Sequence, residues 1–173
     1  MNNDSINRDI SIRMPTAADA GTLADIYNHY VINTHITFDI DPVSVENRLE
    51  WMAGYNNSNR YRLLIAESNG IVLGYASSSR FRVKPAYDNS VETTIYLDPG
   101  AAGSGLGALL YGALLESLAA AGVHRCYGVI ALPNPASIRL HSRFGFTEAG
   151  RLTEVGYKFD QYWDTLWMEK RLG

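Results

Sequence analysis

The sequence predicts a mixed α/β domain built around one parallel pair of strands, and three observations support this fold class. Residues 91–111, VETTIYLDPGAAGSGLGALLY, read as a β-branched strand, a Pro/Gly turn and a glycine-rich entry into an apolar helix. An apolar strand follows at 123–132, and a helix that connects two neighbouring strands makes them parallel. Further patterns on both sides predict a mixed central sheet of about seven strands flanked by about four helices.

The first half of the chain predicts, in order, a strand, two helices and a hairpin. The expected ranges are 10–14 (strand), 17–33 and 43–57 (helices), and 62–67 and 71–81 (hairpin strands). Thr16 has the position of an N-cap before the first helix. Asn69-Gly70 joins the hairpin, because it supplies the positive φ values that a two-residue turn needs. The loop between the helices carries Phe38.

The second half predicts the parallel pair, two helices and two further strands. The expected ranges are 91–97 and 123–132 (parallel strands), 105–121 and 136–143 (helices), and two β-rich runs within 146–172 that separate near 156–160. Asn134 is expected to cap the last helix, with Pro135 at its first position. The apolar composition of 123–132 predicts burial on both faces. A ligand site is expected at the carboxyl ends of the parallel strands.

Composition limits the classes of function. A chain of 173 residues predicts one domain, here 10–173, preceded by a flexible polar tail at 1–9. The net charge of −3 and the lack of a basic run argue against a nucleic-acid partner. No signal peptide or span of about 18 apolar residues is visible, and the lone Cys126 is expected in the core, so a cytoplasmic location is predicted. The scattered His29, His35 and His124 predict no metal site.

The glycine-rich turn is the strongest chemical signal in the chain. Gly103, Gly105 and Gly107 remove Cβ atoms in front of a helix N-terminus, where free N–H groups favour a phosphate or pyrophosphate. An ordinary tight turn would give the same pattern. A dinucleotide fold is a second alternative, because residues 103–108 fit G-x-G-x-x-A, but no acidic residue follows the next strand to hold a ribose.

Glu92 lies in the strand that precedes this turn and is the candidate base. Burial in a strand would raise the pKa of its carboxyl group, which suits a group that removes a proton near neutral pH. Strand alternation places Tyr96 on the face of Glu92, and Ile95 and Leu97 on the other. A solvent-facing carboxylate at the edge of a sheet is the alternative.

Several longer segments resemble one known family. The loop 102–107 (AGSGLG) and the segment 134–146 (NPASIRLHSRFGF) resemble the GCN5-related N-acetyltransferases, the GNAT superfamily. Four further segments resemble its phosphinothricin and methionine sulfone acetyltransferase subgroup. They are 26–28 with Thr37-Phe38, 81–87 (FRVKPAY), 91–96 (VETTIY) and 155–159 (VGYKF). The resemblance covers the chain from about residue 12 to 172.

The resemblance implies transfer of an acetyl group from acetyl-CoA to a primary amine in a ternary complex, with Glu92 as general base. His141 has the place of a residue that protonates the departing thiolate. The cofactor-binding residues that it implies are Ile95, Tyr96, Leu97, Ala102, Gly103, Ser104, Gly105, Leu106, Gly107 and Asn134. The expected substrate-binding residues are Phe38, Phe81, Arg82, Val83, Lys84 and Tyr87, in which Arg82 and Lys84 hold an anionic group.

The chain departs from the family pattern at the start of the loop. Ala102 replaces the usual Arg or Gln, and Ser104 replaces a residue that is often basic. A lost charged hydrogen bond is worth ~1.5–3 kcal/mol, so weaker CoA binding is expected.

The expected substrate is a small amino-acid-like amine of the phosphinothricin, methionine sulfoximine or methionine sulfone type. Acetylation of protein N-termini or polyamines is an alternative, as is a non-catalytic acyl-CoA-binding module. A homodimer is expected, with Tyr162, Trp163 and Trp167 as candidate contacts.

Overall fold

The computed structural model describes residues 10–56 and 59–173. Within them the chain forms a seven-stranded mixed sheet with four α-helices, as the sequence predicted. The tail expected at 1–9 lies outside the described residues, as does residue 57, the expected end of the second helix. That helix ends earlier than predicted, at Ala53, with Gly54 as its C-cap. None of the described helices is long and apolar enough to cross a membrane.

The strands follow the order β1-β2-β3-β4-β5-β7-β6 across the sheet. Their bounds are Ile10–Arg13 (β1), Leu63–Ser68 (β2), Ile71–Arg80 (β3), Ser90–Leu97 (β4), Arg125–Ala131 (β5), Thr147–Lys158 (β6) and Gln161–Arg171 (β7). The pair β4 and β5 is parallel and its neighbours pair antiparallel, as expected for strands joined by a helix.

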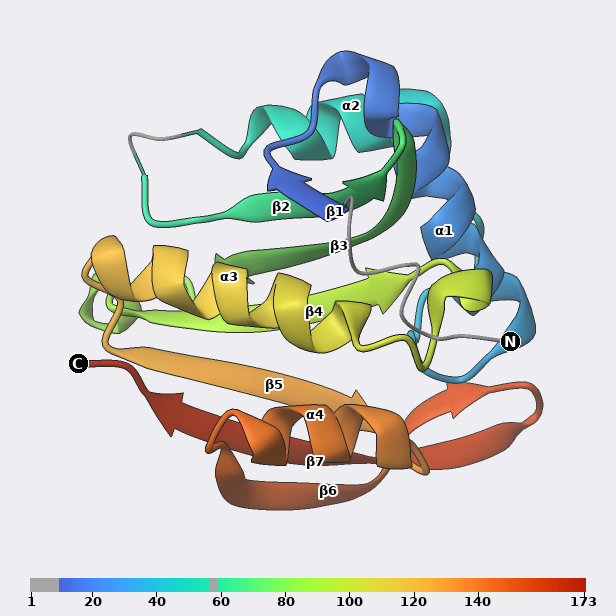
Figure 1. Ribbon diagram of the computed structural model, residues 1–173. Helices are drawn as coiled ribbons and strands as arrows, with labels where there is room; N and C mark the ends of the chain where they lie inside the picture. Colours follow the sequence, from blue (N-terminus) through green and yellow to red (C-terminus); the bar gives the residue numbers. More distant parts are fainter. Residues whose placement is uncertain (1–9, 57–58) are drawn as a thin grey trace.

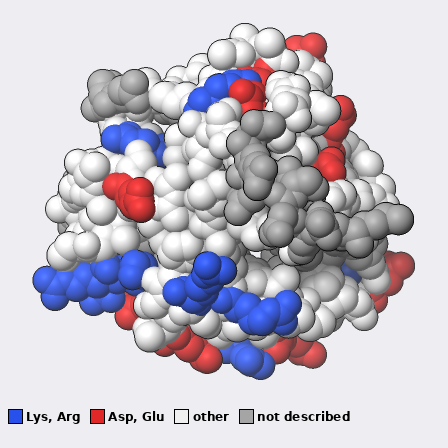
Figure 2. Space-filling model, viewed as in Figure 1, with Lys and Arg blue, Asp and Glu red and all other residues white. Residues whose placement is uncertain are grey.

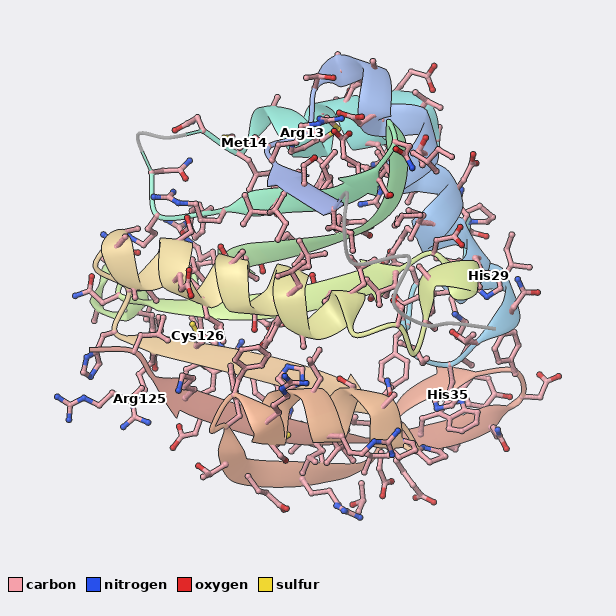
Figure 3. The ribbon with its side chains drawn as sticks, viewed as in Figure 1. Arg13, Met14, His29, His35, Arg125 and Cys126 are labelled. Carbon is pink, nitrogen blue, oxygen red and sulfur yellow. The ribbon has the colours of Figure 1, made fainter. Side chains whose placement is uncertain are left out.

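The helices cover the two faces of the sheet. They are α1 (Ala20–Asn33), α2 (Val45–Ala53), α3 (Leu106–Ala120) and α4 (Pro135–Arg143). Figure 1 looks onto the face that α3 and α4 cover, whereas α1 and α2 pack on the other side. Leu110, Leu114 and Leu118 of α3 are fully buried against the sheet. Cys126, labelled in Figure 3, lies in this core as predicted.

Local signals explain where several elements begin and end. Asn69 and Gly70 have φ values of 52° and 77°, which is the conformation that the tight turn between β2 and β3 needs. The Asn134 side chain caps α4 by accepting a hydrogen bond from the Ser137 amide at 3.1 Å. The Ser44 hydroxyl caps α2 in the same way, so that helix begins at Val45 rather than at residue 43.

The prediction that both faces of β5 are buried was wrong. Cys126, Gly128 and Ile130 are buried, but Arg125, Tyr127 and Val129 on the other face are only partly buried. The reason is that the apolar core on this other face joins α1 and α2 to β2, β3 and β4 and includes no residue of β5. The pairing of β4 with β5 also ends at Glu92 and Tyr127, although both strands continue beyond it, so Val129 lies past the last pair.

The loop between α1 and α2 docks onto the β6–β7 hairpin. The Lys158 ammonium is buried and donates a hydrogen bond of 2.8 Å to the Thr37 carbonyl oxygen. The His35 ring stacks on Trp163 with a centroid distance of 4.0 Å, and Figure 3 shows His35 facing this hairpin. The Phe38 ring lies against the backbone of Gly156, where an added Cβ would come within 2.3 Å of it. These contacts set the position of Phe38.

Candidate active site

A cavity of about 410 Å³ occupies the opening between β4 and β5. Its walls include residues 93–97 of β4 and 129–131 of β5, the glycine-rich loop and one side of α4. The expected cofactor residues Ile95, Tyr96, Leu97, Ala102, Gly103, Gly105, Gly107 and Asn134 line it, as does His141. The opening exists because hydrogen bonding between the two strands stops after Glu92.

The cavity reaches residues on both faces of the sheet. Thr93 points toward α3, where its hydroxyl lies 2.8 Å from the Tyr111 hydroxyl. Thr94 points the other way, with its hydroxyl 3.0 Å from that of Ser77. Tyr96 shares the face of Thr94, and its ring packs on Tyr30 of α1. The alternation predicted along β4 is therefore confirmed, and the gap between the strands connects the two faces.

The glycine-rich loop offers free N–H groups at the start of α3. Gly103 and Gly105 have φ values of +81° and +87°, which residues with a Cβ rarely adopt. The Ser104 hydroxyl donates a hydrogen bond of 2.7 Å to the Ala101 carbonyl oxygen and holds the loop in place. The amides of Gly103, Ser104 and Gly105 donate no hydrogen bond to any residue that the structure describes. Such amides at a helix N-terminus suit a pyrophosphate.

Two arginines of α4 line the same cavity and were not predicted from the sequence. Arg139 and Arg143 are one helical turn apart, so both lie on the side of α4 that borders the cavity. Figure 2 shows Lys and Arg side chains gathered on the lower part of this face, where Figure 1 places α4. Their spacing after the Asn134 cap was the available signal. They supply positive charge that Ala102 does not.

Glu92 lies in the middle strand of the sheet, on the face opposite the glycine-rich loop. Its side chain is partly buried, and this burial raises the pKa of the carboxyl group, while the nearby positive charge of Arg82 lowers it. Glu92 does not itself line the cavity, but Thr93 and Thr94, the next residues of β4, do. The carboxylate therefore lies where the two strands begin to separate, and not at a solvent-facing edge.

His141 is buried on the opposite side of the same opening, and only 3% of it is exposed. Its Nδ1 lies 2.8 Å from the Ser137 carbonyl oxygen, so we assign the ring proton to Nδ1. Its Nε2 is buried and has no hydrogen-bond partner among the described residues. Burial lowers the pKa of the imidazole, which favours a neutral ring with a free lone pair on Nε2.

Aromatic rings and one cation surround the Glu92 side of the opening. The Phe81 ring stacks on Tyr127 at 4.3 Å and contacts Tyr87 edge-on at 5.8 Å. The Arg82 guanidinium lies 4.5 Å from the Phe81 ring centre and 5.4 Å from that of Trp167. Three predicted substrate residues, Phe81, Arg82 and Tyr87, therefore lie together. Two residues that were not predicted as substrate contacts, Tyr127 and Trp167, lie with them.

The other predicted substrate residues lie apart from this group. Val83 and Lys84 are exposed in the loop after Phe81, and Phe38 lies against Gly156 of β6. Tyr127 could have been found from alternation along β5, because Cys126 faces the core and its neighbour must face the other way. Trp167 has no comparable local signal. Within residues 10–56 and 59–173, no three His, Cys, Asp or Glu side chains are grouped to hold a metal.

Comparisons with known proteins agree with this geometry. Residues 12–167 match the family model described as acetyltransferase (GNAT) domain. A phosphinothricin N-acetyltransferase of Streptomyces coelicolor is 50% identical over 95% of this chain and 97% of its own length. An L-methionine sulfoximine/L-methionine sulfone acetyltransferase of Salmonella typhimurium is 34% identical over 94% and 95% of the two chains.

A solved structure gives the same result for the fold. It is a putative acetyltransferase from Salmonella typhimurium with its cofactor acetyl-CoA, and it superposes with a TM-score of 0.91. The two chains are 34% identical, and the superposition covers 96% of this chain and 95% of the other.

Proposed function

The chain belongs to the GNAT family and is an N-acetyltransferase, and we propose that it acetylates the primary amine of a small amino-acid-like substrate. The substrate class is that of phosphinothricin, methionine sulfoximine and methionine sulfone. The observation that carries the proposal is the cavity between β4 and β5, which connects the free amides of the glycine-rich loop with the face that carries Glu92.

The residues on the α3 and α4 side fit acetyl-CoA, which supplies the acetyl group as an activated thioester. The amides of the loop from Ala102 to Gly107 would hold its pyrophosphate, and Arg139 and Arg143 would add positive charge. Asn134 uses its side-chain oxygen to cap α4, which leaves its NH₂ group for the cofactor. Ile95, Tyr96 and Leu97 would line the path of the pantetheine arm.

Glu92 would remove the proton that an amine must lose before it attacks. An alkyl ammonium with a pKa near 10 is almost fully protonated at neutral pH. Burial raises the pKa of Glu92, so its carboxylate has a higher proton affinity than a solvated glutamate. A positioned general base contributes about 100- to 10,000-fold to a rate.

His141 would move a second proton on the opposite side of the opening. The neutral ring leaves the buried Nε2 lone pair without a partner among the described residues, so Nε2 can take up a proton as the amide forms. The lowered pKa makes the resulting imidazolium a ready donor to the departing sulfur. The ring then returns to its neutral state, and no net proton remains on the histidine.

The aromatic group around Glu92 would bind the rest of the amine substrate. Arg82 would pair with a carboxylate or phosphinate, and Phe81 and Tyr87 would contact the apolar part. Val83 and Lys84 lie in the same loop and Phe38 on the docked loop, so these three would complete the site from its rim.

The test is release of CoA thiol from acetyl-CoA by the purified protein. We expect turnover with phosphinothricin, methionine sulfoximine or methionine sulfone, and a loss of about 100-fold or more in Glu92→Gln. Glu116→Gln is the control, because Glu116 is exposed on α3. CoA binding by calorimetry without turnover on any amine would instead indicate a non-catalytic module. Full activity in Glu92→Gln would remove Glu92 from the base role.

We also propose a cytoplasmic homodimer. The exposed Tyr157, Phe159 and Tyr162 of the β6–β7 hairpin support such a contact. Trp163 and Trp167 are less suited to it, because Trp163 stacks on His35 and Trp167 packs beside Phe81. Sedimentation of the wild type and of Tyr162→Glu tests this: a dimer should dissociate in the variant, and a monomeric wild type would contradict it.

A further inference from the structure

Two neighbouring positions of β7 carry buried polar atoms that lack partners. The Trp167 Nε1 and the Thr165 Oγ1 are both buried and make no hydrogen bond to any described residue. An indole N–H can only donate a hydrogen bond, so nothing but an acceptor atom can satisfy it. A buried donor without a partner costs stability, and such atoms in a native protein call for an explanation.

Both side chains are on the face of the sheet that carries Glu92. Trp167 is paired with Val129 and Thr165 with Ala131, and residues paired directly across an antiparallel ladder share a face. Val129 and Ala131 line the cavity between β4 and β5. The unsatisfied atoms of β7 are therefore one strand away from the opening, on its amine side.

The surroundings of Trp167 favour an oxygen atom of the substrate, rather than its ammonium group, beside the indole N–H. The Arg82 guanidinium lies 5.4 Å from the centre of the indole ring. A positive charge beside an unpaired N–H repels a cation and attracts an oxygen that carries negative charge. Glu92 is the group left to receive the ammonium of the substrate. The charge of Arg82 lowers the pKa of Glu92 and so favours its ionised form.

We propose that the Trp167 N–H, assisted by the Thr165 hydroxyl, donates a hydrogen bond to an oxygen of the amine substrate. Trp167 is then a specificity-determining residue that selects amines with an oxygen-bearing group at a set distance from the nitrogen. This inference rests on the proposed function, because it assigns a role within the same site.

Two pairs of amines test the inference and identify the oxygen. Methionine sulfone and methionine differ by the sulfonyl oxygens, and methionine and 3-(methylthio)propylamine differ by the carboxylate. Trp167→Phe keeps an aromatic ring but lacks the N–H. We expect it to reduce the kcat/KM preference within one pair by about fivefold to tenfold, the size of one hydrogen bond. Thr165→Val should reduce the same kcat/KM preference. The affinity for CoA should be unchanged in both variants.

Two other tryptophans provide matched controls. Trp51 lies in α2, where its ring packs on Tyr55 and Tyr75. Trp51→Phe should therefore leave the kcat/KM preference within both amine pairs unchanged. Trp163→Phe removes an N–H that donates a hydrogen bond of 2.8 Å to the Lys158 carbonyl oxygen, so it should lower the Tm. Trp167→Phe should not lower the Tm through a lost hydrogen bond, since the Trp167 N–H has no partner within residues 10–56 and 59–173.

Calorimetric titration of the same amines into the CoA complex repeats the comparison without turnover. Binding that weakens in Trp167→Phe would support the inference even if acetylation failed, so the two proposals can fail separately. Unchanged preferences and affinities in Trp167→Phe would overturn the inference. A wild-type protein that neither acetylates nor binds these amines would overturn both.

Discussion

His141 lies so close to Gly128 that a Cβ built on the glycine would be 2.4 Å from the histidine Nε2. Gly128 directly follows Tyr127, the residue of β5 that pairs with Glu92. Glu92 and His141 therefore flank the start of the same opening from opposite faces of the sheet. The two groups to which we assign proton transfer are separated by the thickness of the sheet, and the opening between the strands connects them.

This contact predicts the effect of a single methyl group. Gly128→Ala should displace the His141 ring, lower the free energy of unfolding by about 1–3 kcal/mol and reduce kcat. Gly112→Ala is the control, because its Cβ would meet the Phe144 ring at an ordinary 3.4 Å in the interior of α3. That variant should be neutral or more stable, since alanine favours helix. Thermal melts and steady-state rates check both, and a Gly128→Ala protein with wild-type values would refute the proposed contact.

The pH dependence of the rate should report on Glu92. Its carboxyl must be ionised to accept a proton, so activity is expected to fall as the pH drops through the raised pKa of Glu92. Arg82 lowers this pKa by its charge. In Arg82→Ala the acidic limb of the kcat profile should therefore move to higher pH. Arg171→Ala, at an exposed position of β7, should leave the limb in place. A shift to lower pH in Arg82→Ala would contradict the assignment.

The contact between Phe38 and Gly156 offers a test of the docked loop. In Gly156→Ala the new Cβ would lie 2.3 Å from the Phe38 ring, so the ring must move. We expect a higher KM for the amine with little change in CoA affinity. Gly150→Ala in the same strand is the matched control, because no atom lies within 4 Å of its Cβ. Equal KM values for the two variants would show that Phe38 does not contribute to amine binding.

The departure at Ala102 predicts a gain of affinity. Ala102→Arg restores a charged donor at the start of the loop and should tighten CoA binding about tenfold, as one charged hydrogen bond allows. Arg139→Ala should weaken binding by a similar factor, because Arg139 lines the cavity. Glu148→Gln, at an exposed position of β6, is the control. Calorimetry with CoA measures all three, and an unchanged affinity in Arg139→Ala would exclude a role of Arg139 in binding CoA.

Acid stability should depend on Asp19. The Arg13 guanidinium holds both oxygens of this carboxylate at 2.8 and 3.0 Å and lowers its pKa to about 2. A lowered pKa contributes stability that is present above the unfolded-state value near 4 and is lost as the pH falls toward 2.

The size of this effect is modest, because Arg13 is about one-third exposed. Asp19→Asn should lower the free energy of unfolding at pH 7 by about 1–2 kcal/mol, after allowance for solvent screening. It should also flatten the pH dependence between pH 4 and 2. Asp25→Asn, exposed on α1, should do neither. Urea melts at several pH values check the prediction, and an unchanged slope in Asp19→Asn would contradict it.

Local spacing in the sequence was sufficient to predict most elements of this fold. Alternation along β4 placed Glu92 and Tyr96 on one face, and the crossover helix made β4 and β5 parallel. The Asn134 cap, the Asn69-Gly70 turn and the glycine-rich loop were also predictable. Each of these features depends on residues only a few positions apart, so the backbone geometry of a single segment determines it.

The tertiary structure alone decided which side chains meet at the opening. Lys158 and Thr37 are 121 positions apart and bring the Phe38 loop onto β6. Trp167 reaches the Glu92 face through the register of β7 on β5, and the cavity lined by Val129 and Ala131 follows from the early end of the β4–β5 ladder. Registers and strand separation result from packing of the whole sheet, which no short segment of sequence encodes.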